Sequence, residues 1–171
     1  MRKVTRTAPA KINLGLDVTG TRPDGYHLLE TVFQAVSIAD TVTVELTDTP
    51  DIALTCDVAG VPCSPKNIAW KAAQRYLDAA GLTDGVQIHI EKRIPMEAGM
   101  GGGSTDGAAV LLALQELTGN ALSMDKLAEI AVSLGADVPF FLYGGTAYAA
   151  GIGEKLEKLP VFSTDCMGIA K

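Results

Sequence analysis

The sequence predicts an α+β domain with a mixed sheet and helices packed against it. Short segments with alternating apolar and polar residues, typical of half-buried strands, occur mainly within the first 56 residues and again at 86–91 and 146–150. Longer segments with apolar residues at helical spacing lie at 65–80, 108–117 and 124–134. Because the strands are grouped and do not alternate regularly with helices, this order favours α+β over a repeated βαβ series.

The composition fits one compact domain. The chain has 171 residues, of which 47% are hydrophobic, enough for a core that supports itself. Its 14 basic and 20 acidic residues give a net charge of -6 with no basic stripe, which argues against nucleic acid as a partner. No segment is long enough to cross a bilayer and no apolar run follows the basic N-terminus, so we predict a cytoplasmic protein without a membrane partner.

The N-terminal third predicts strands joined by turns. Two strands are expected at Val4–Ala8 and Ile12–Thr19, with a break at Pro9-Ala10-Lys11 between them. Arg22-Pro-Asp-Gly25 predicts a tight turn. Further strands are expected at Leu28–Ile38, Asp40–Leu46 and Ile52–Cys56.

The first helix is predicted at Pro65–Ala80. Ser64 can cap it, Pro65 suits its first position, and Gly81 suits its end. The strand predicted next, at Val86–Glu91, places His89 on its polar face, where a solvated side chain is expected rather than a catalytic one.

The C-terminal half predicts two helices and two strands. An apolar helix covers Ala108–Leu117, and a second begins after the cap Ser123 and runs to about Leu134. A strand follows at Thr146–Ala150, and another begins at Cys166–Lys171. The three cysteines, Cys56, Cys63 and Cys166, form no CxxC pair and predict reduced, buried thiols rather than a zinc site.

A glycine cluster is the most informative motif. Gly99, Gly101, Gly102 and Gly103 lie between a predicted strand and a helix that starts around Ser104. Glycine backbone can approach a ligand closely, and a helix N-terminus offers unpaired N–H groups, so the pattern favours a phosphate cradle over a flexible linker. No lysine follows in the Walker A position, and the GxGxxG dinucleotide pattern is not met either.

Two charged residues in apolar surroundings are candidates for chemistry on a hydroxyl group. Asp137 lies in Gly135-Ala-Asp-Val-Pro139, where it could be a general base or an ordinary helix cap. Lys11 lies between two strand-like segments, where it could assist a carboxylate or be a surface lysine. Residue type alone leaves both alternatives open.

Several short motifs in the same order resemble the GHMP kinase family. They are Pro9-Ala-Lys-Ile-Asn-Leu14, Gly25-Tyr-His27, Pro65-Lys-Asn67, Lys92-Arg-Ile-Pro95, Gly99-Met-Gly-Gly-Gly-Ser-Thr105, Gly135-Ala-Asp-Val-Pro139 and Gly151-Ile-Gly-Glu-Lys155. The resemblance implies the family's N-terminal fold, which is similar to domain 2 of ribosomal protein S5. It also implies an ATP- and Mg²⁺-dependent small-molecule kinase. Gly25-Tyr-His27 resembles the branch that acts on a cytidine diphosphate-linked polyol.

The resemblance assigns roles to individual residues. Asp137 would be the general base and Lys11 its partner beside the substrate hydroxyl. Asn13, Tyr26 and His27 would bind substrate, with Tyr26 stacked on the cytosine ring. The nucleotide would be held by Pro95, Gly99, Gly101, Gly102, Gly103, Ser104, Thr105, Asn67 and Lys92. Metal ligands are not assigned.

The resemblance also divides the chain. Residues 1–160 would form the ATP-binding domain, and residues 161–171 would begin a truncated C-terminal lobe whose unpaired strand could support self-association. Glu97 stands where a small residue is expected, and Asp106 could cap the helix or assist a metal. Two alternative functions stay open: another GHMP kinase, acting on homoserine, mevalonate or a sugar, and a catalytically silent nucleotide-binding half-protein.

Overall fold

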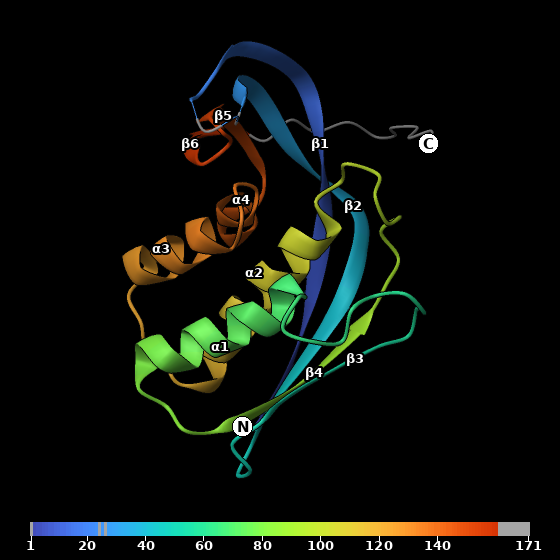
Figure 1. Ribbon diagram of the computed structural model, residues 1–171, viewed down its shortest axis with the longest axis vertical. Coiled ribbons are helices and arrows are strands. Elements are labelled where there is room, and N and C mark those ends of the chain that lie inside the picture. Colours follow the sequence, from blue (N-terminus) through green and yellow to red (C-terminus); the bar gives the residue numbers. More distant parts are fainter. Residues whose placement is uncertain (1, 24, 26, 161–171) are drawn as a thin grey trace.

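The structure, a computed structural model, describes residues 2–23, 25 and 27–160. Within this part of the chain one six-stranded sheet carries four helices on one face (Figure 1). The strands are β1 Lys3–Thr21, β2 His27–Thr47, β3 Ile52–Cys56, β4 Gly85–Glu91, β5 Thr146–Gly151 and β6 Lys155–Leu159. The helices are α1 Ile68–Ala80, α2 Gly102–Leu117, α3 Met124–Leu134 and α4 Val138–Tyr143. The predicted α+β class is confirmed.

Strand β2 organises the sheet. One edge of β2 pairs with β5 over residues 29–34 and with β4 over residues 41–47, while its other edge pairs with β1 along most of its length. The order is therefore β3-β4-β2-β5-β6 with β1 beside β2, and only the β3–β4 pair is parallel.

The predicted break at Pro9-Ala10-Lys11 is wrong: β1 is continuous and bends there instead. Pro9 pairs with Ala39 but Lys11 pairs with Ala35, so β2 advances four residues while β1 advances two. Such a bulge absorbs the mismatch and bends both strands. Proline is tolerated because β1 has β2 as its one partner strand among the described residues. The same bulge joins the two strands predicted at 28–38 and 40–46 into β2.

The helix predictions are largely confirmed, with corrections at the starts. Helix α1 begins three residues after Pro65, because the side chain of Asn67, not Ser64, caps it by accepting a hydrogen bond from the amide of Ala69. Gly81 ends it with φ 64°, as predicted. Helix α2 starts earlier than expected, at Gly102. The short elements α4 and β6 were not predicted, and Cys166–Lys171 lies outside the described residues.

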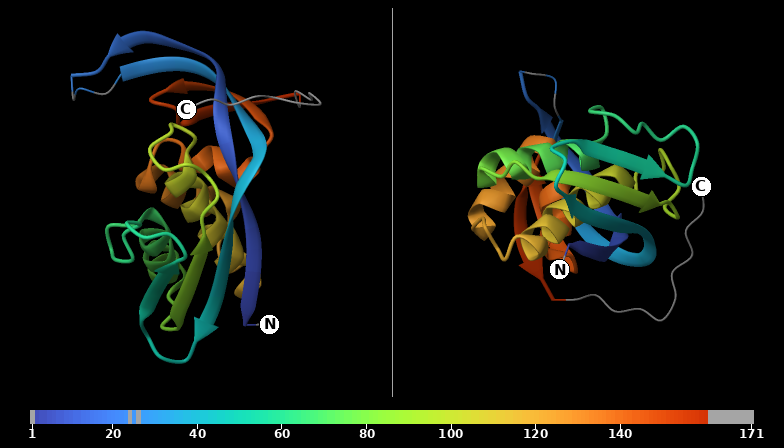
Figure 2. Two further views of the ribbon diagram at one scale, coloured as in Figure 1. Left: turned by 90° about the vertical axis from the view of Figure 1, so that its right-hand side faces the viewer. Right: turned by 90° about the horizontal axis from the view of Figure 1, so that it is seen from below.

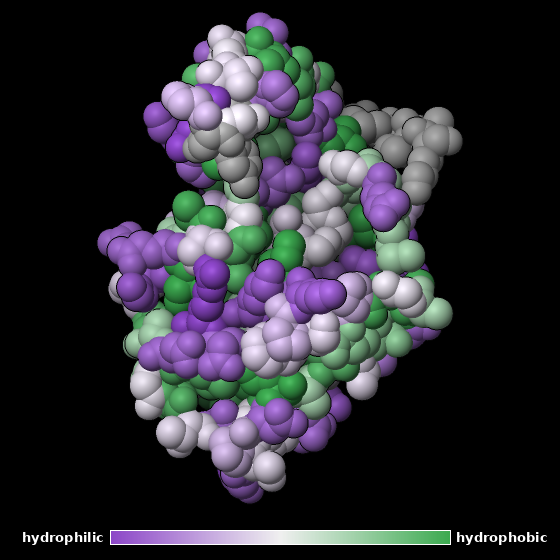
Figure 3. Space-filling view, in the orientation of Figure 1, coloured by the Kyte–Doolittle hydropathy of each residue, from purple (hydrophilic) through white to green (hydrophobic). Residues whose placement is uncertain are grey.

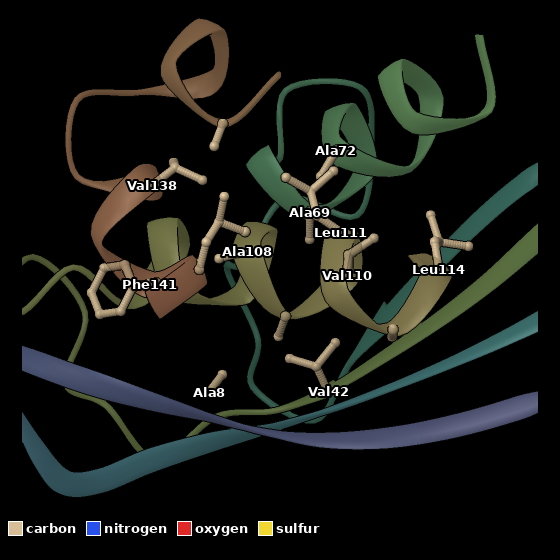
Figure 4. Packing of buried hydrophobic residues seen from close by; sticks show 14 of the residues in the cluster. Ala8, Val42, Ala69, Ala72, Ala108, Val110, Leu111, Leu114, Val138 and Phe141 are labelled. Atoms are coloured by element: carbon tan, nitrogen blue, oxygen red, sulfur yellow. The ribbon is translucent and has the colours of Figure 1, made fainter. Parts of the chain in front are cut away.

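Helix α2 forms the centre of the core. It packs against β1 and β2 on one side and against α1 and α4 on the other, as Figure 4 shows for Val42 below Val110 and for Ala69 above Leu111. Close contact between α1 and α2 depends on a glycine, since a Cβ on Gly107 would lie 2.6 Å from Cγ2 of Ile68. The layers are therefore the sheet, α2, and the remaining helices.

The outer ends of β1 and β2 extend beyond this core as a hairpin arm (Figure 2). Leu14, Leu16 and Val18 on the arm are more than 40% exposed. On the helix-bearing face, hydrophilic residues form a band across the body below the arm (Figure 3). No described helix is both long and apolar enough to cross a membrane. Cys63 is exposed and Cys56 half-buried, so the prediction of buried thiols is wrong for Cys63.

Candidate functional site

The glycine cluster forms a loop that leads directly into α2. Gly99 and Gly101 have φ values of 70° and 72°, in the left-handed region that favours glycine. Gly101 is the N-cap of α2 and has no side chain to bind the amides of the first helical turn. These free N–H groups and the positive end of the helix dipole face the loop, which is an arrangement that binds anions.

Side chains at two loop positions would collide with their surroundings. A Cβ on Gly101 would lie 2.7 Å from the ring of Phe141, and a Cβ on Gly102 would lie 3.2 Å from Nζ of Lys92. Close packing therefore favours glycine at 101 and 102, and the left-handed backbone favours it at 99 and 101.

The loop lines a cavity of about 890 Å³, within the size range of small-molecule sites. Its walls come from residues 60–62, 66–68, 92 and 94–104, together with Asp106. Of the residues expected to hold a nucleotide, the cavity brings together Asn67, Lys92, Pro95, Gly99, Gly101, Gly102, Gly103 and Ser104. Thr105 is not in this wall, and only 1% of it is exposed.

Lys11 connects the glycine loop to Asp137. The bulge in the sheet buries Lys11 to 6% exposure, and its amide donates a 3.0 Å hydrogen bond to the carbonyl of Met100 in the loop. Its Nζ lies 3.6 Å from Oδ2 of Asp137 and 4.8 Å from the centre of the Phe33 ring. A buried ammonium group thus lies between the anion cradle and a carboxylate.

Asp137 is not an ordinary helix cap. It occupies the N-cap position of α4, yet its side chain makes no capping hydrogen bond. The carboxylate is 33% exposed, so it can meet a ligand while it faces Lys11. Gly153, in the turn between β5 and β6, lies against it, since a Cβ there would be 3.6 Å from Oδ1 of Asp137. The geometry suits a base whose charge the ammonium stabilises.

Asn67 and Lys92 line the cavity, but their side chains already have partners. Oδ1 of Asn67 caps α1, and its Nδ2 donates a 2.8 Å hydrogen bond to the carbonyl of Pro62. Nζ of Lys92 contacts Asp40 at 2.5 Å and Asp106 at 2.9 Å. If Asn67 and Lys92 also bind a nucleotide, they do so while keeping these contacts or by giving some of them up.

The Lys92 cluster is buried and has unusual electrostatics. Burial raises the pKa of Asp106 to about 7, even though the Lys92 ammonium opposes the rise. Burial alone would lower the pKa of Lys92, but Asp106 and Asp40 outweigh it and hold that pKa above its ordinary value. Oδ1 of Asp106 is buried without a hydrogen-bond partner among the described residues.

The residues expected to bind substrate are spread along the arm. Oδ1 of Asn13 accepts a 2.7 Å hydrogen bond from Nζ of Lys11, which brings Asn13 into the Lys11–Asp137 group. His27 begins β2 at the tip of the hairpin, where its Nδ1 lies 3.2 Å from the hydroxyl of Thr21. Tyr26 lies outside the described residues. The structure therefore joins Asn13, but not His27, to the base and the glycine loop.

Sequence reasoning missed several residues that shape this site. Phe33 and Phe141 pack against Lys11 and Gly101, and Asp40 binds Lys92. Asp40 carried a usable signal, a single carboxylate in the middle of an apolar strand segment. Glu97, which stands where a small residue was expected, is exposed and has a left-handed backbone (φ 56°).

The part of the chain that forms the glycine loop, α2 and Asp137 is similar to the N-terminal domain of the GHMP kinases. Residues 67–145 match the family described as GHMP kinases N terminal domain. Among curated relatives, the chain is similar to the 4-diphosphocytidyl-2-C-methyl-D-erythritol kinases. It is 51% identical over 156 residues to that of Geobacter metallireducens (91% of this chain, 56% of the relative) and 45% identical over 164 residues to that of Clostridium tetani (96% and 58%).

Solved structures show the same similarity. A crystal structure of 4-(cytidine 5'-diphospho)-2C-methyl-D-erythritol kinase superposes with a TM-score of 0.77 at 48% identity, covering 91% of this chain and 55% of that one. Homoserine kinase from Cytophaga hutchinsonii superposes with a TM-score of 0.70 at 24% identity, covering 94% of this chain and 52% of that one, which shows a shared fold. The chain thus spans a little over half the length of the relatives it matches.

Proposed function

We propose that this chain is the nucleotide-binding part of an ATP-dependent kinase that phosphorylates the 2-hydroxyl of 4-diphosphocytidyl-2-C-methyl-D-erythritol. The products would be ADP and the 2-phosphate, within non-mevalonate biosynthesis of isoprenoid precursors. The observation that carries the proposal is the 3.6 Å approach of the Lys11 ammonium to the Asp137 carboxylate, beside a glycine loop to which Lys11 is hydrogen-bonded. Identity near 50% to relatives with that name supports the choice of substrate.

The nucleotide would occupy the 890 Å³ cavity, with its phosphates on the glycine loop. ATP supplies the phosphoryl group when bound. The amides of 102–104 would face the phosphates, and the hydroxyl of Ser104 lies in the same wall. Thr105 stays a prediction from the family resemblance.

Mg²⁺ is part of the proposal and would be carried mainly by the nucleotide. The described residues hold no cluster of three or more His, Cys, Asp or Glu side chains. Mg²⁺ commonly keeps several waters and binds through substrate phosphates with one or two carboxylates. We therefore assign no protein ligand to the ion.

Asp137 and Lys11 would act on the substrate hydroxyl. Asp137 accepts the hydroxyl proton as the oxygen forms its bond to phosphorus and the bond to the ADP oxygen breaks. Lys11 stabilises the negative charge that develops on the attacking oxygen. Asn13 holds the Lys11 ammonium by its 2.7 Å hydrogen bond and can orient it between substrate and base.

Tyr26 and His27 are proposed to bind the cytidine end of the substrate. We also propose that residues 1–160 form the nucleotide-binding domain and that residues 161–171 begin a second lobe, in keeping with the greater length of the relatives. A cytoplasmic location and self-association through the last segment stay predictions.

The test is ADP release from Mg-ATP with this substrate, comparing the wild type with Asp137→Asn. We expect Asp137→Asn to lower kcat by ~10²–10⁴-fold, with little change in the Kd for a non-hydrolysable ATP analogue, because a general base contributes about this much. Asp125→Asn, a change on the exposed first turn of α3, is the matched control and should keep wild-type turnover.

Three outcomes would contradict the proposal. Equal turnover in Asp137→Asn and wild type would remove Asp137 from the mechanism. Turnover with homoserine, mevalonate or a sugar in place of the cytidyl substrate would point to another GHMP kinase. Analogue binding without turnover on any of these substrates would favour a catalytically silent half-protein.

A further inference from the structure

Both ends of the glycine loop converge on one buried side chain. The glycine loop begins after Ile94, three residues beyond the end of β4 at Glu91, and returns to regular structure at Gly102, the first residue of α2. Lys92 lies just before the first point, and its Nζ reaches under the second, where a Cβ on Gly102 would be 3.2 Å away. The segment 95–101 is thus closed at its base around the Lys92 ammonium.

Asp40 holds the outgoing end of the loop. It lies in β2 next to the bulge and is fully buried. Its Oδ1 accepts hydrogen bonds from the amides of Arg93 at 2.5 Å and Ile94 at 2.8 Å, and its Oδ2 contacts Nζ of Lys92 at 2.5 Å. One carboxylate therefore fixes both the backbone that enters the loop and the ammonium beneath it.

Asp106 holds the returning end. It lies in the second turn of α2, its side chain is 4% exposed, and its Oδ2 contacts Nζ of Lys92 at 2.9 Å. This contact ties the beginning of α2 to the same ammonium that Asp40 holds. The Lys92 side chain is only 8% exposed, so water screens the two contacts weakly.

Such a cluster is a costly way to gain stability alone. Burying two carboxylates with one ammonium removes three charges from water, and apolar replacements of similar shape are often as stable. Above the pKa of Asp106, about 7, the cluster carries a net negative charge beneath the anion cradle, which is also unfavourable for a polyphosphate ligand. The geometric effect is specific, because three segments that are far apart in sequence are held at one atom.

We propose that Asp40, Lys92 and Asp106 form a clasp that positions the glycine loop, so that Lys92 acts on the nucleotide through the loop rather than by direct contact. This inference rests on the proposed nucleotide site for its consequence in binding, but not for its effect on the loop. Asp40, Lys92 and Asp106 are positioning residues. Opening the clasp on the Asp106 side should free the loop and the first turn of α2 while the Asp40–Lys92 contact remains.

Hydrogen exchange of the free chain tests the clasp without any ligand. Asp106→Ala removes the acceptor for Lys92, and Asp106→Asn retains an acceptor of the same shape. We expect Asp106→Ala to speed exchange of the amides in 105–108, which donate the first hydrogen bonds within α2, by about tenfold or more, since local opening governs exchange there, while amides in α1 and β3 keep wild-type rates. Asp106→Asn should restore most of the protection. Asp48→Ala, which breaks the exposed Arg2–Asp48 pair, is the matched control and should change neither region.

Binding of a non-hydrolysable ATP analogue by the same variants tests the consequence. A displaced loop should raise the Kd in Asp106→Ala by about 10- to 100-fold, with recovery in Asp106→Asn. Wild-type exchange at 105–108 in Asp106→Ala would overturn the clasp. Uniformly faster exchange across the whole domain would overturn it too, because it would indicate a stability role only. If the wild type binds no nucleotide, the proposed function fails, and the exchange result still decides on the clasp.

Discussion

The pKa of Asp106 leads to a measurable dependence of stability on pH. Burial raises that pKa from 3.8 to about 7, so the folded state holds a proton on Asp106 at pH values where the unfolded chain has released it. A carboxyl group with a raised folded pKa contributes stability at low pH that is lost as pH rises toward the folded pKa. Between pH 5 and pH 8 this group alone should lower the free energy of unfolding by about 3 kcal/mol, at 1.36 kcal/mol per pH unit up to pH 7.

Asp106→Asn isolates this effect, because asparagine resembles the protonated acid and does not titrate. Urea unfolding of both proteins at pH 5, 6, 7 and 8 should show the wild type losing stability relative to the variant as pH rises. Lys92 does not disturb the comparison, since its raised pKa keeps it charged throughout this range. Asp48, whose pKa is lowered by a hydrogen bond from Arg2, is the same in both proteins. A difference between the two proteins that is constant from pH 5 to pH 8 would refute the reasoning.

Three further substitutions test the packing around the site. Gly107→Ala should lower the free energy of unfolding by about 1–3 kcal/mol, because its Cβ would meet Cγ2 of Ile68 at 2.6 Å. In an Ile68→Ala background, which lacks that Cγ2 atom, the cost of Gly107→Ala should shrink, and an unchanged cost would show that the clash is not its cause. Tyr76→Phe should cost about 1–2 kcal/mol in thermal unfolding, since it removes the 2.7 Å hydrogen bond to the buried Gln115, and an unaltered Tm would contradict this. Asn67→Ala should cost about 1 kcal/mol by loss of the α1 cap, and Asn67→Ser, which keeps a capping oxygen, should recover part of that loss; equal losses in the two variants would show that the cap is not responsible.

Local signals in the sequence predicted the helices well. Gly81 and Ser123 mark an end and a start that the structure confirms, because αL caps and hydroxyl caps act within a few residues. Ser64 was expected to cap α1, but Asn67, three residues later, does so. Serine and asparagine are equally good N-cap residues, so the local sequence did not distinguish them. The missed helix α4 has only six residues, too few for a helical period to be visible.

Features that depend on distant contacts could not be predicted from local pattern. The bulge at Pro9 and Lys11 is set by the register with β2, so a proline that reads locally as a break becomes a bend. Lys11 and Asp137 are separated by most of the chain, and only the resemblance to a family suggested that they meet. The role of Asp106 stayed open because its partner Lys92, which also contacts Asp40 of β2, reaches it only through the tertiary fold.

The division of β2 between two neighbours has a consequence for synthesis of the chain. The half of β2 that pairs with β4 can find its partner once residue 91 has emerged, but the half that pairs with β5 must wait until residue 151. At about 5–20 residues per second, this leaves the edge at 29–34 unpaired for roughly 3–12 seconds longer. A nascent chain with an open strand edge is prone to pair with other chains. We therefore expect the yield of native protein to depend on translation speed and on chaperones. This dependence should be stronger than in a domain of the same length whose strands pair soon after they emerge.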